Sequence, residues 1–303
     1  MSHIIDHVGN TPLIQIPYSK NPNVRIFAKC EWFNPSGSVK DRAAANMIKT
    51  GLESGIASGK TLIDATSGNT GIAYALYGAS LGLPVELALP ENASEERKLI
   101  LQNYGVTLHL TSAMEGTDGA QRFVEFHVKE NSDRYFYPNQ YANDANWQAH
   151  VKSTGPEIWS QTKESVTHFV AGLGTTGTFI GTSRFLQTKG VHCVSVEPDN
   201  PMHGLEGWKH METAIVPKIY DTTVANDTMT ADTIRSYEVA KAATKYLGLF
   251  LSPSAAANLD AALRLADDLK NGVIVTVFPD NAMKYLKESF WSDNDFDIDN
   301  PFG

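Results

Sequence analysis

One lysine follows a rigid turn near the start of the chain. Lys40 stands in the stretch NPSGSVKDRAA, residues 34–44, directly after Pro, Ser and Gly and at the start of an expected helix. A lysine amine attacks a carbonyl group when desolvation or a nearby cation lowers its pKa. These residues alone leave two interpretations of Lys40 open, a reactive amine and an ordinary surface charge on the helix.

Two glycine-containing loops each lead from an expected strand into an expected helix. The first is ATSGNTGIAYAL at 65–76, with donors at Ser67, Gly68, Asn69 and Thr70. The second lies in THFVAGLGTTGTFIG and holds Gly174, Thr175, Thr176, Gly177 and Thr178. Backbone N–H groups and hydroxyls at a helix N-terminus favour an anion, and three threonines suit a compact terminal phosphate.

The second loop also fits a dinucleotide site. Gly172, Gly174 and Gly177 form G-x-G-x-x-G between a strand and a helix, and Glu197 ends the next expected strand. A Rossmann site places its ribose-binding acid at about that position, roughly 20 residues on. A nicotinamide-dependent dehydrogenase is therefore an alternative of a different class.

A late serine begins another expected helix. In FLSPSAAANLDAAL, residues 250–263, Ser252 precedes Pro253 and an alanine-rich run. Serine at the N-cap with proline at the first helical position is a strong start signal. Capping alone explains Ser252.

The elements that position these residues alternate along the chain. Short apolar runs are separated by helix-compatible segments: RIFAKCE at 25, TLIDAT at 61, VELALP at 85, VTLHLT at 106, THFVAG at 167, HCVSVE at 192 and VIVTVF at 273. This alternation predicts an α/β fold with a mostly parallel twisted sheet flanked by helices. Runs that are apolar throughout indicate a sheet covered on both faces.

Composition excludes several classes of protein. The 303 residues carry a net charge of -9, which argues against nucleic-acid binding. The two cysteines, Cys30 and Cys193, lie in apolar runs and predict buried thiols in a reducing compartment, with no metal cluster. No secretory signal is expected, and the most apolar window, 72–89, is broken by Gly82, Pro84 and Glu86, so no membrane span is expected.

Taken together, these motifs resemble the cysteine synthase family, the pyridoxal-phosphate enzymes of the tryptophan-synthase-β fold type. The opening VGNTPL and the segment STGPEIW at 153–159 add to the resemblance, which runs from about residue 8 to about residue 290. Within the family the GTTGT loop is similar to the B-type isozyme, because A-type enzymes usually carry glycine in place of Thr176.

The resemblance implies a two-domain, fold type II enzyme that binds pyridoxal 5′-phosphate. A larger cofactor-phosphate domain would comprise residues 1–36 and 146–303, and a smaller mobile domain, residues 37–145, would carry the substrate-carboxylate loop. The family also implies a cytoplasmic homodimer acting on small molecules, without nucleic-acid or membrane partners.

The resemblance assigns roles residue by residue. Lys40 matches the Schiff-base lysine, Asn69 the partner of the cofactor's 3′-oxygen, and Ser252 the partner of its ring nitrogen. The phosphate loop corresponds to Gly174, Thr175, Thr176, Gly177 and Thr178. The positions that hold the substrate carboxylate correspond to Thr66, Ser67, Gly68, Thr70 and Gln140.

The implied reaction is β-replacement on an O-activated L-serine through an aminoacrylate, with sulfide or thiosulfate as acceptor, giving L-cysteine or S-sulfocysteine. Lys209 aligns with an arginine of B-type enzymes, including those that prefer phosphoserine, so it is a candidate to bind the leaving group. Ser254 and Ala282 depart from the family pattern, with effects left open. Cystathionine β-synthase chemistry and a catalytically silent scaffold are further alternatives.

Overall fold

The computed structural model describes residues 3–66, 68–293 and 299–303. Contacts divide the chain into two compact units. The first unit comprises Met1–Val8, Asn34–Ser36 and Lys40–Asn146, and the second comprises Gly9–Phe33, Gly37–Val39 and Trp147–Gly303. The functional division implied by the resemblance, 1–36 and 146–303 against 37–145, stays a prediction.

The first unit is built on a four-stranded parallel sheet with the order β5-β4-β3-β6. Its strands are β3 (Thr61–Ala65), β4 (Val85–Pro90), β5 (Thr107–Thr111) and β6 (Tyr135–Phe136). Its helices are α1 (Lys40–Glu53), α2 (Asn69–Leu81), α3 (Glu95–Asn103) and α4 (Gly116–Glu130). Two parallel strands that follow each other in the chain must be joined by a crossover, and here helices form these connections.

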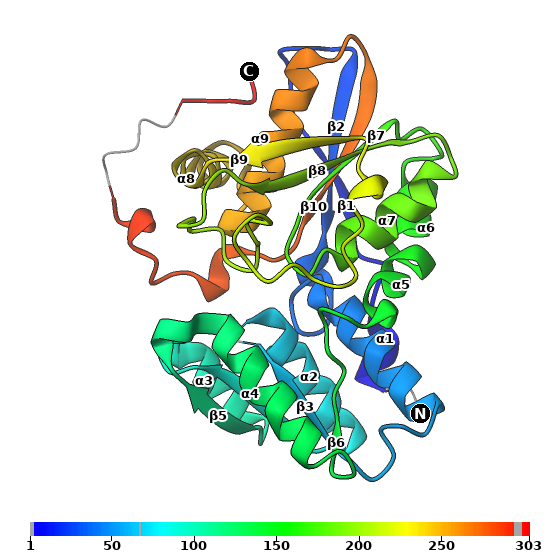
Figure 1. The fold of residues 1–303 in the computed structure, drawn as a ribbon. Helices are drawn as coiled ribbons and strands as arrows, with labels where there is room; N and C mark the ends of the chain where they lie inside the picture. The colour runs from blue at the N-terminus through cyan, green and yellow to red at the C-terminus, as the bar shows by residue number, and fades with distance from the viewer. Residues whose placement is uncertain (1–2, 67, 294–298) are drawn as a thin grey trace. The chain divides into compact units, whose positions relative to one another are not determined.

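Alternate side chains of these strands enter two cores. Leu62 and Leu87 face a cluster formed with α1 and α2, whereas Ile63 and Ala88 face a cluster formed with α4. Figure 1 shows α1 and α2 on one face of this sheet and α4 on the other. The runs lack polar alternation because both faces of the sheet are covered.

The second unit is built on a six-stranded sheet with the order β1-β2-β10-β7-β8-β9. Its strands are β1 (Leu13–Ile16), β2 (Val24–Cys30), β7 (His168–Gly172), β8 (His192–Pro198), β9 (Asp227–Ala231) and β10 (Gly272–Phe278). Only the pair formed by β1 and β2 is antiparallel among the described strand pairs.

Helices again cover both faces of this sheet (Figure 1). α8 (Thr233–Ala242) and α9 (Pro253–Asp268) pack on one face, and α6 (Thr154–Gln161) and α7 (Gly177–Gln187) on the other. α5 (Asp144–Lys152) begins in the first unit and continues into the second from Trp147. Val170 and Ile274 enter the first of these cores, and Phe169 and Val275 the second.

The predicted α/β class is confirmed, and each of the seven apolar runs coincides with a strand to within one residue at either end. The sequence analysis did not identify β1, β6 or β9. β6 has only two residues, and β9 reads DTMTA, an edge strand whose first four residues are exposed or half-buried. In the part of the chain that the structure describes, no helix is both long and apolar enough to cross a membrane.

Candidate active site

The turn before Lys40 is held by the residue that follows it. Asp41 is fully buried in the first turn of α1. Its carboxylate accepts hydrogen bonds from the Ser36 backbone N–H at 2.9 Å, from the Ser36 hydroxyl at 2.5 Å and from the Tyr77 hydroxyl. Asp41 thus joins the turn and α2 at the point where Lys40, half-buried, begins α1.

The first predicted anion loop connects β3 to α2. Thr66 is 5% exposed and follows the strand directly, its N–H bonded to the Ala88 carbonyl at 3.0 Å. Gly68 is the N-cap of α2 and donates its N–H to the Thr66 hydroxyl at 3.3 Å. Asn69 is the first helical residue, so it lies at the positive end of the helix dipole. Ser67 lies outside the described residues.

The structure brings two predicted substrate residues together across 70 positions of sequence. The Thr70 hydroxyl donates to Gln140 Oε1 at 2.8 Å, and both side chains are buried. Gln140 Nε2 donates to the carbonyl of Ala65 at 3.1 Å. These bonds fix which end of the Gln140 amide faces the loop, so the loop has one defined arrangement.

The second predicted anion loop contains a strained residue. Thr176 has a φ of 72°, in the left-handed region, and its carbonyl accepts from Ile180 N as α7 begins. A β-branched residue there costs on the order of 1–3 kcal/mol, and glycine avoids that cost. The Thr176 hydroxyl is buried and has no hydrogen-bond partner among the described residues.

An unpartnered buried hydroxyl is a liability unless a ligand satisfies it. Thr176 and Thr178 lie at the N-terminus of α7, where the helix dipole favours an anion. The Thr176 hydroxyl and the position of the loop therefore fit a phosphate group.

The glycines before this loop are explained by close packing. A Cβ at Gly172 would lie 1.9 Å from the Trp208 ring, and one at Gly174 would lie 2.1 Å from the Gly207 carbonyl oxygen. Lys209 donates its backbone N–H to the Leu173 carbonyl at 2.9 Å. The segment 207–209 thus packs against the loop, and the G-x-G pattern needs no dinucleotide to account for it.

Ser252 has the predicted N-cap role at the start of α9. Its hydroxyl accepts from Ala255 N at 3.2 Å and donates to the Asp280 carbonyl at 3.2 Å, and the side chain is fully buried. The hydroxyl of Ser254, one of the two family departures, lies 3.2 Å from that of Ser252. The other departure, Ala282, is fully buried and has no positive φ, so its backbone does not require glycine.

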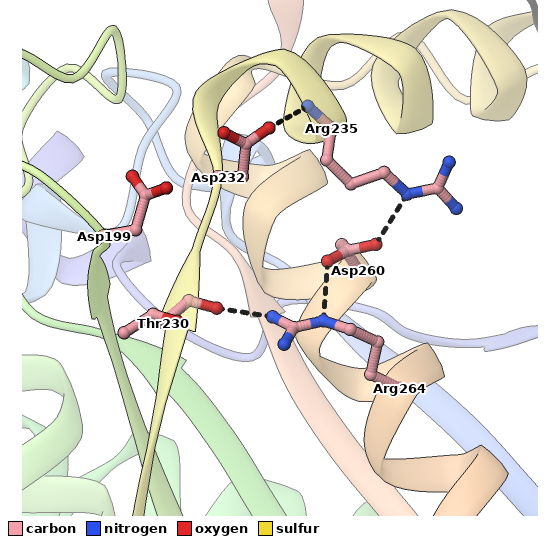
Figure 2. Close-up of a pocket in the computed structure, with 6 residues that line it drawn as sticks. All are labelled: Asp199, Thr230, Asp232, Arg235, Asp260 and Arg264. Carbon is pink, nitrogen blue, oxygen red and sulfur yellow. Dashed lines mark hydrogen bonds and ion pairs between the residues drawn. The ribbon is translucent and has the colours of Figure 1, made fainter.

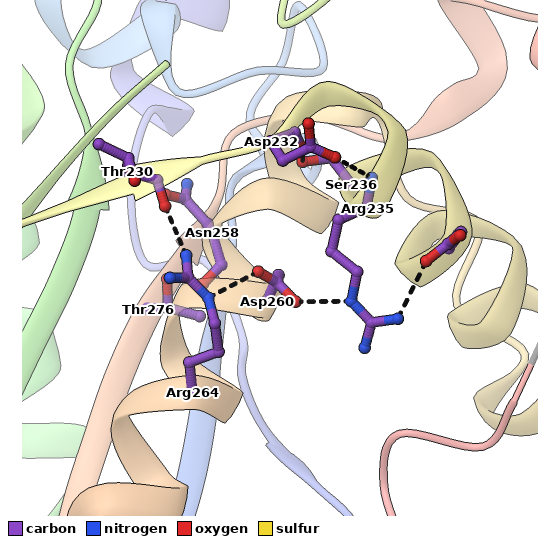
Figure 3. Close-up of polar contacts among 9 residues, drawn as sticks. Thr230, Asp232, Arg235, Ser236, Asn258, Asp260, Arg264 and Thr276 are labelled. Carbon is purple, nitrogen blue, oxygen red and sulfur yellow. Dashed lines mark hydrogen bonds and ion pairs between the residues drawn. The ribbon is translucent and has the colours of Figure 1, made fainter. Parts of the chain in front are cut away.

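Asn258, in the second turn of α9, ties this helix to the strand that leads into the second predicted anion loop. Its Oδ1 accepts from Gly172 N at 2.8 Å, and its Nδ2 donates to the Val277 carbonyl at 2.8 Å. Figure 3 shows Asn258 beside Thr276, whose hydroxyl donates to the Val170 carbonyl at 2.9 Å. The buried amide therefore holds α9 against β7 and β10.

A buried histidine supports the other side of the loop. His150, on α5, is 1% exposed. Its Nε2 lies 3.3 Å from the Thr178 hydroxyl and its Nδ1 lies 2.8 Å from the Thr154 hydroxyl. The ring thus links the loop to α6.

Figure 2 shows a surface pocket of about 360 Å³ whose lining includes none of the predicted site residues. The pocket is lined by Asp199, Thr230, Asp232, Arg235, Asp260 and Arg264. Asp260 bridges two arginines inside it, with Arg235 Nε at 3.2 Å and Arg264 Nε at 2.9 Å. Arg264 also donates to the Thr230 carbonyl at 2.6 Å. Asp260 pairs with both guanidinium groups, and Arg235 lies on α8 whereas Asp260 lies on α9. We therefore interpret the cluster as a structural clasp, a set of ion pairs that holds α8 against α9.

The two cysteines are free, buried thiols, as predicted. Burial raises the pKa of Cys30 to about 12 and that of Cys193 to about 11. Both stay protonated at neutral pH, so neither is suited to nucleophilic chemistry.

Sequence analysis missed four residues that hold the site: Asp41, Asp64, His150 and Asn258. Asp64 gave a signal, because it is the one acid inside the apolar run TLIDA. The other three lie in helices, where a polar residue is ordinary, and only their buried contacts mark them.

Comparison with known proteins places this arrangement in context. Residues 4–280 match the family model described as "Pyridoxal-phosphate dependent enzyme". The chain is 48% identical to a cysteine synthase of Aquifex aeolicus, over 96% of this chain and 93% of the relative. It is 37% identical to a cysteine synthase B of Pseudomonas aeruginosa, over 95% of this chain and 97% of the relative.

The fold has close counterparts among solved structures. The crystal structure of a cysteine synthase from Entamoeba histolytica superposes with a TM-score of 0.92 at 32% identity, covering 98% of this chain and 92% of that one.

Proposed function

This chain belongs to the family of pyridoxal-phosphate dependent enzymes, and we propose that it is a cysteine synthase. The reaction is β-replacement on an O-activated L-serine, with O-acetyl-L-serine as the first choice of donor and sulfide as the acceptor. The observation that carries this proposal is the likeness to cysteine synthases over nearly the whole chain.

The described residues offer a suitable set of contacts for the cofactor. Gly174, Thr175, Thr176, Gly177 and Thr178 would hold its phosphate, Asn69 its 3′-oxygen and Ser252 its ring nitrogen. When bound, the cofactor supplies an electron sink that labilises the substrate Cα–H bond. A neutral serine hydroxyl at the ring nitrogen, unlike a carboxylate, holds no proton there, which suits elimination and replacement at Cβ.

Lys40 would hold the cofactor through its amine. The same amine would remove the proton from the substrate Cα and later return it. Asp41 fixes the first turn of α1 and so limits where the amine can reach.

The loop between β3 and α2 holds the substrate. Thr66, Ser67, Gly68, Thr70 and Gln140 would bind its carboxylate, and the N-terminus of α2 favours that charge. The Thr70–Gln140 hydrogen bond orients two of these groups before substrate arrives.

Lys209 is the proposed contact for the leaving group of the donor. Its backbone is bonded to Leu173, directly before the phosphate loop, and its side chain is half-buried. A lysine binds phosphate as a point charge, so O-phospho-L-serine is a second donor to test.

Turnover with defined substrates tests the proposal. Purified protein with pyridoxal phosphate is given acetylserine, phosphoserine or serine, and then sulfide, thiosulfate or homocysteine, with the amino-acid product measured by chromatography. We expect cysteine from acetylserine and sulfide, and at least a thousandfold loss of turnover in Lys40→Ala. Full turnover by Lys40→Ala would contradict the role of Lys40.

The same panel separates the alternatives. Preference for homocysteine would indicate cystathionine β-synthase chemistry, a nicotinamide-dependent oxidation would indicate a dehydrogenase, and no product from any pair would indicate a silent scaffold. No feature of the described site favours any of these three.

We also propose a homodimer acting in the cytoplasm. The two free thiols support a reducing compartment. Light scattering coupled to size-exclusion chromatography measures the mass directly, and a monomer's mass would contradict the dimer.

A further inference from the structure

A buried carboxylate with no role in the proposed reaction lies on the strand that leads into the proposed substrate loop. Asp64, on β3, is fully buried. Its Oδ1 accepts from Ala65 N at 2.8 Å, and its Oδ2 accepts from the Tyr74 hydroxyl at 2.9 Å and from Gln140 N at 3.3 Å. Three donors from different segments of the first unit thus converge on one side chain.

Two of these donors belong to segments that bear proposed substrate contacts. Gln140 is held by its backbone N–H on Asp64 and by its carbonyl, which accepts from Asn146 Nδ2 at 2.7 Å. Its side chain bonds the Thr70 hydroxyl. Tyr74 lies one turn along α2 from Thr70. Asp64 therefore holds both members of the Thr70–Gln140 pair. It bonds Gln140 directly, and it bonds Tyr74 on the helix that carries Thr70.

The charge of Asp64 is stabilised by hydrogen bonds and opposed by burial. Burial raises its pKa to about 7, against the bonds from Ala65, Tyr74 and Gln140, which lower it. The titratable groups facing it are Tyr74 on α2 and Tyr137 and Tyr141 after β6, whose pKa values burial and then the Asp64 charge raise. Two carboxylates on α4 face these tyrosines: the charge of Asp118 raises the pKa of Tyr141, and the charge of Glu125 raises the pKa of Tyr137.

We propose that Asp64 is a positioning residue for the amino-acid substrate: its ionised carboxylate holds Gln140 and α2 in the arrangement that receives the substrate carboxylate. This inference rests on the proposed function and adds a pH dependence to it. Protonation of Asp64 weakens the bond from Gln140 N and releases the pair, so affinity for the amino acid falls as the pH falls below about 7.

The test compares Asp64→Asn holoenzyme with the native holoenzyme. L-Serine, whose hydroxide is a poor leaving group, is titrated while the visible absorbance of the cofactor is followed, between about pH 6 and about pH 8.5. The ratio of the two dissociation constants cancels ionisations that both proteins share. At the upper pH we expect the dissociation constant of Asp64→Asn for L-serine to be about tenfold higher than that of the native protein. At the lower pH the two dissociation constants should be nearly equal. KM for acetylserine should rise similarly, with kcat changed less.

Two further variants sharpen the result. Tyr74→Phe keeps the carboxylate but removes one bond to its charged form, so the midpoint of the native profile should move to higher pH. Glu86→Gln is the matched control: Glu86 is a buried carboxylate on β4, and it accepts hydrogen bonds from His109, Arg134 and Tyr135, none of which is a proposed substrate residue. Its L-serine affinity should equal that of the native protein.

The outcomes distinguish this inference from the proposed function. If Thr70→Val weakens L-serine binding while Asp64→Asn binds like the native protein at every pH, Asp64 has no positioning role. If Thr70→Val leaves binding unchanged, the proposed substrate loop is itself wrong. Should Asp64→Asn not fold, an unmoved midpoint in Tyr74→Phe overturns the inference.

Discussion

At the scale of the residue, Thr176 carries the clearest sign of a ligand. Its backbone is in a conformation that favours glycine, and its buried hydroxyl has no hydrogen-bond partner in the described ranges. Strain of this kind persists where the surroundings enforce it, and often where function needs it. The resemblance singled out the same position, because A-type enzymes usually have glycine there. A phosphate would satisfy the hydroxyl.

Substitution of Thr176 separates the hydroxyl from the strain. Thr176→Val keeps the shape and removes the hydroxyl, so the dissociation constant of pyridoxal phosphate should rise about tenfold, as for the loss of one hydrogen bond to a charged group. Equilibrium dialysis measures it. Thr176→Gly should lose similar affinity while removing the strain on the order of 1–3 kcal/mol.

Thr182 provides the control for this prediction. It is also a buried threonine of α7 whose hydroxyl is unpartnered among the described residues, but it lies beyond the loop. Thr182→Val should bind the cofactor like the native protein. Equal losses in both valine variants would mean that helix packing, and not the hydroxyl, sets the affinity.

At the scale of the element, α9 joins the stability of the second unit to its proposed site. Ser252 caps the helix, and Asn258 bonds the strand that leads into the phosphate loop. Asp260 then clasps α9 to α8 through Arg235, and to β9 through Arg264 (Figure 3). The same helix therefore presents a hydroxyl at its N-terminus and is anchored along its length.

Removal of the clasp should lower stability. Asp260 is 6% exposed and its arginines are about half exposed, so solvent screens the pairs. For Asp260→Asn we expect a loss of about 1–2 kcal/mol in the free energy of unfolding, measured by urea titration. Glu238→Gln, which removes only the outer partner of Arg235, should lose under about 0.5 kcal/mol. Equal losses would contradict a central role for Asp260.

At the scale of the whole molecule, two buried charges behave differently. Lys29 is fully buried but pairs with Glu157 at 2.6 Å and donates to the Thr11 carbonyl at 2.6 Å. By contrast, burial raises the pKa of Asp64, and three hydrogen-bond donors lower it by a smaller amount. The raised pKa of Asp64 links global stability to pH.

The direction of that linkage follows from the raised pKa. The folded state keeps a proton on Asp64 up to about pH 7, whereas the unfolded chain loses it near about pH 4. The free energy of unfolding therefore falls as the pH rises between these values, and the loss is complete above about pH 7. Asp64→Asn should gain stability over the native protein at the higher pH, on the order of a few kcal/mol.

Urea unfolding at the two ends of this pH range measures the effect. A stability difference between the two proteins that stays constant with pH would contradict the raised pKa. A variant that is more stable but binds substrate less well would place Asp64 among residues where function opposes stability.

The family, the cofactor and the α/β class could all be predicted from the order of the residues alone, and the comparisons confirm them. Strand periodicity, the glycines at helix ends and the cap at Ser252 are local signals, set by neighbours within a few residues. The buried thiols followed in the same way from the apolar runs around Cys30 and Cys193. The roles of the individual site residues stay predictions.

Tertiary structure alone decided the contacts that hold those residues. Asp64 meets Gln140 across 76 positions, and Asn258 meets Gly172 across 86, because crossovers of parallel sheets bring distant segments together. No local pattern encodes such pairs. The left-handed backbone of Thr176 is likewise imposed by its surroundings, since a threonine alone avoids it. The sequence by itself determined which elements form and which cofactor they suit. The fold decided which buried groups set their geometry.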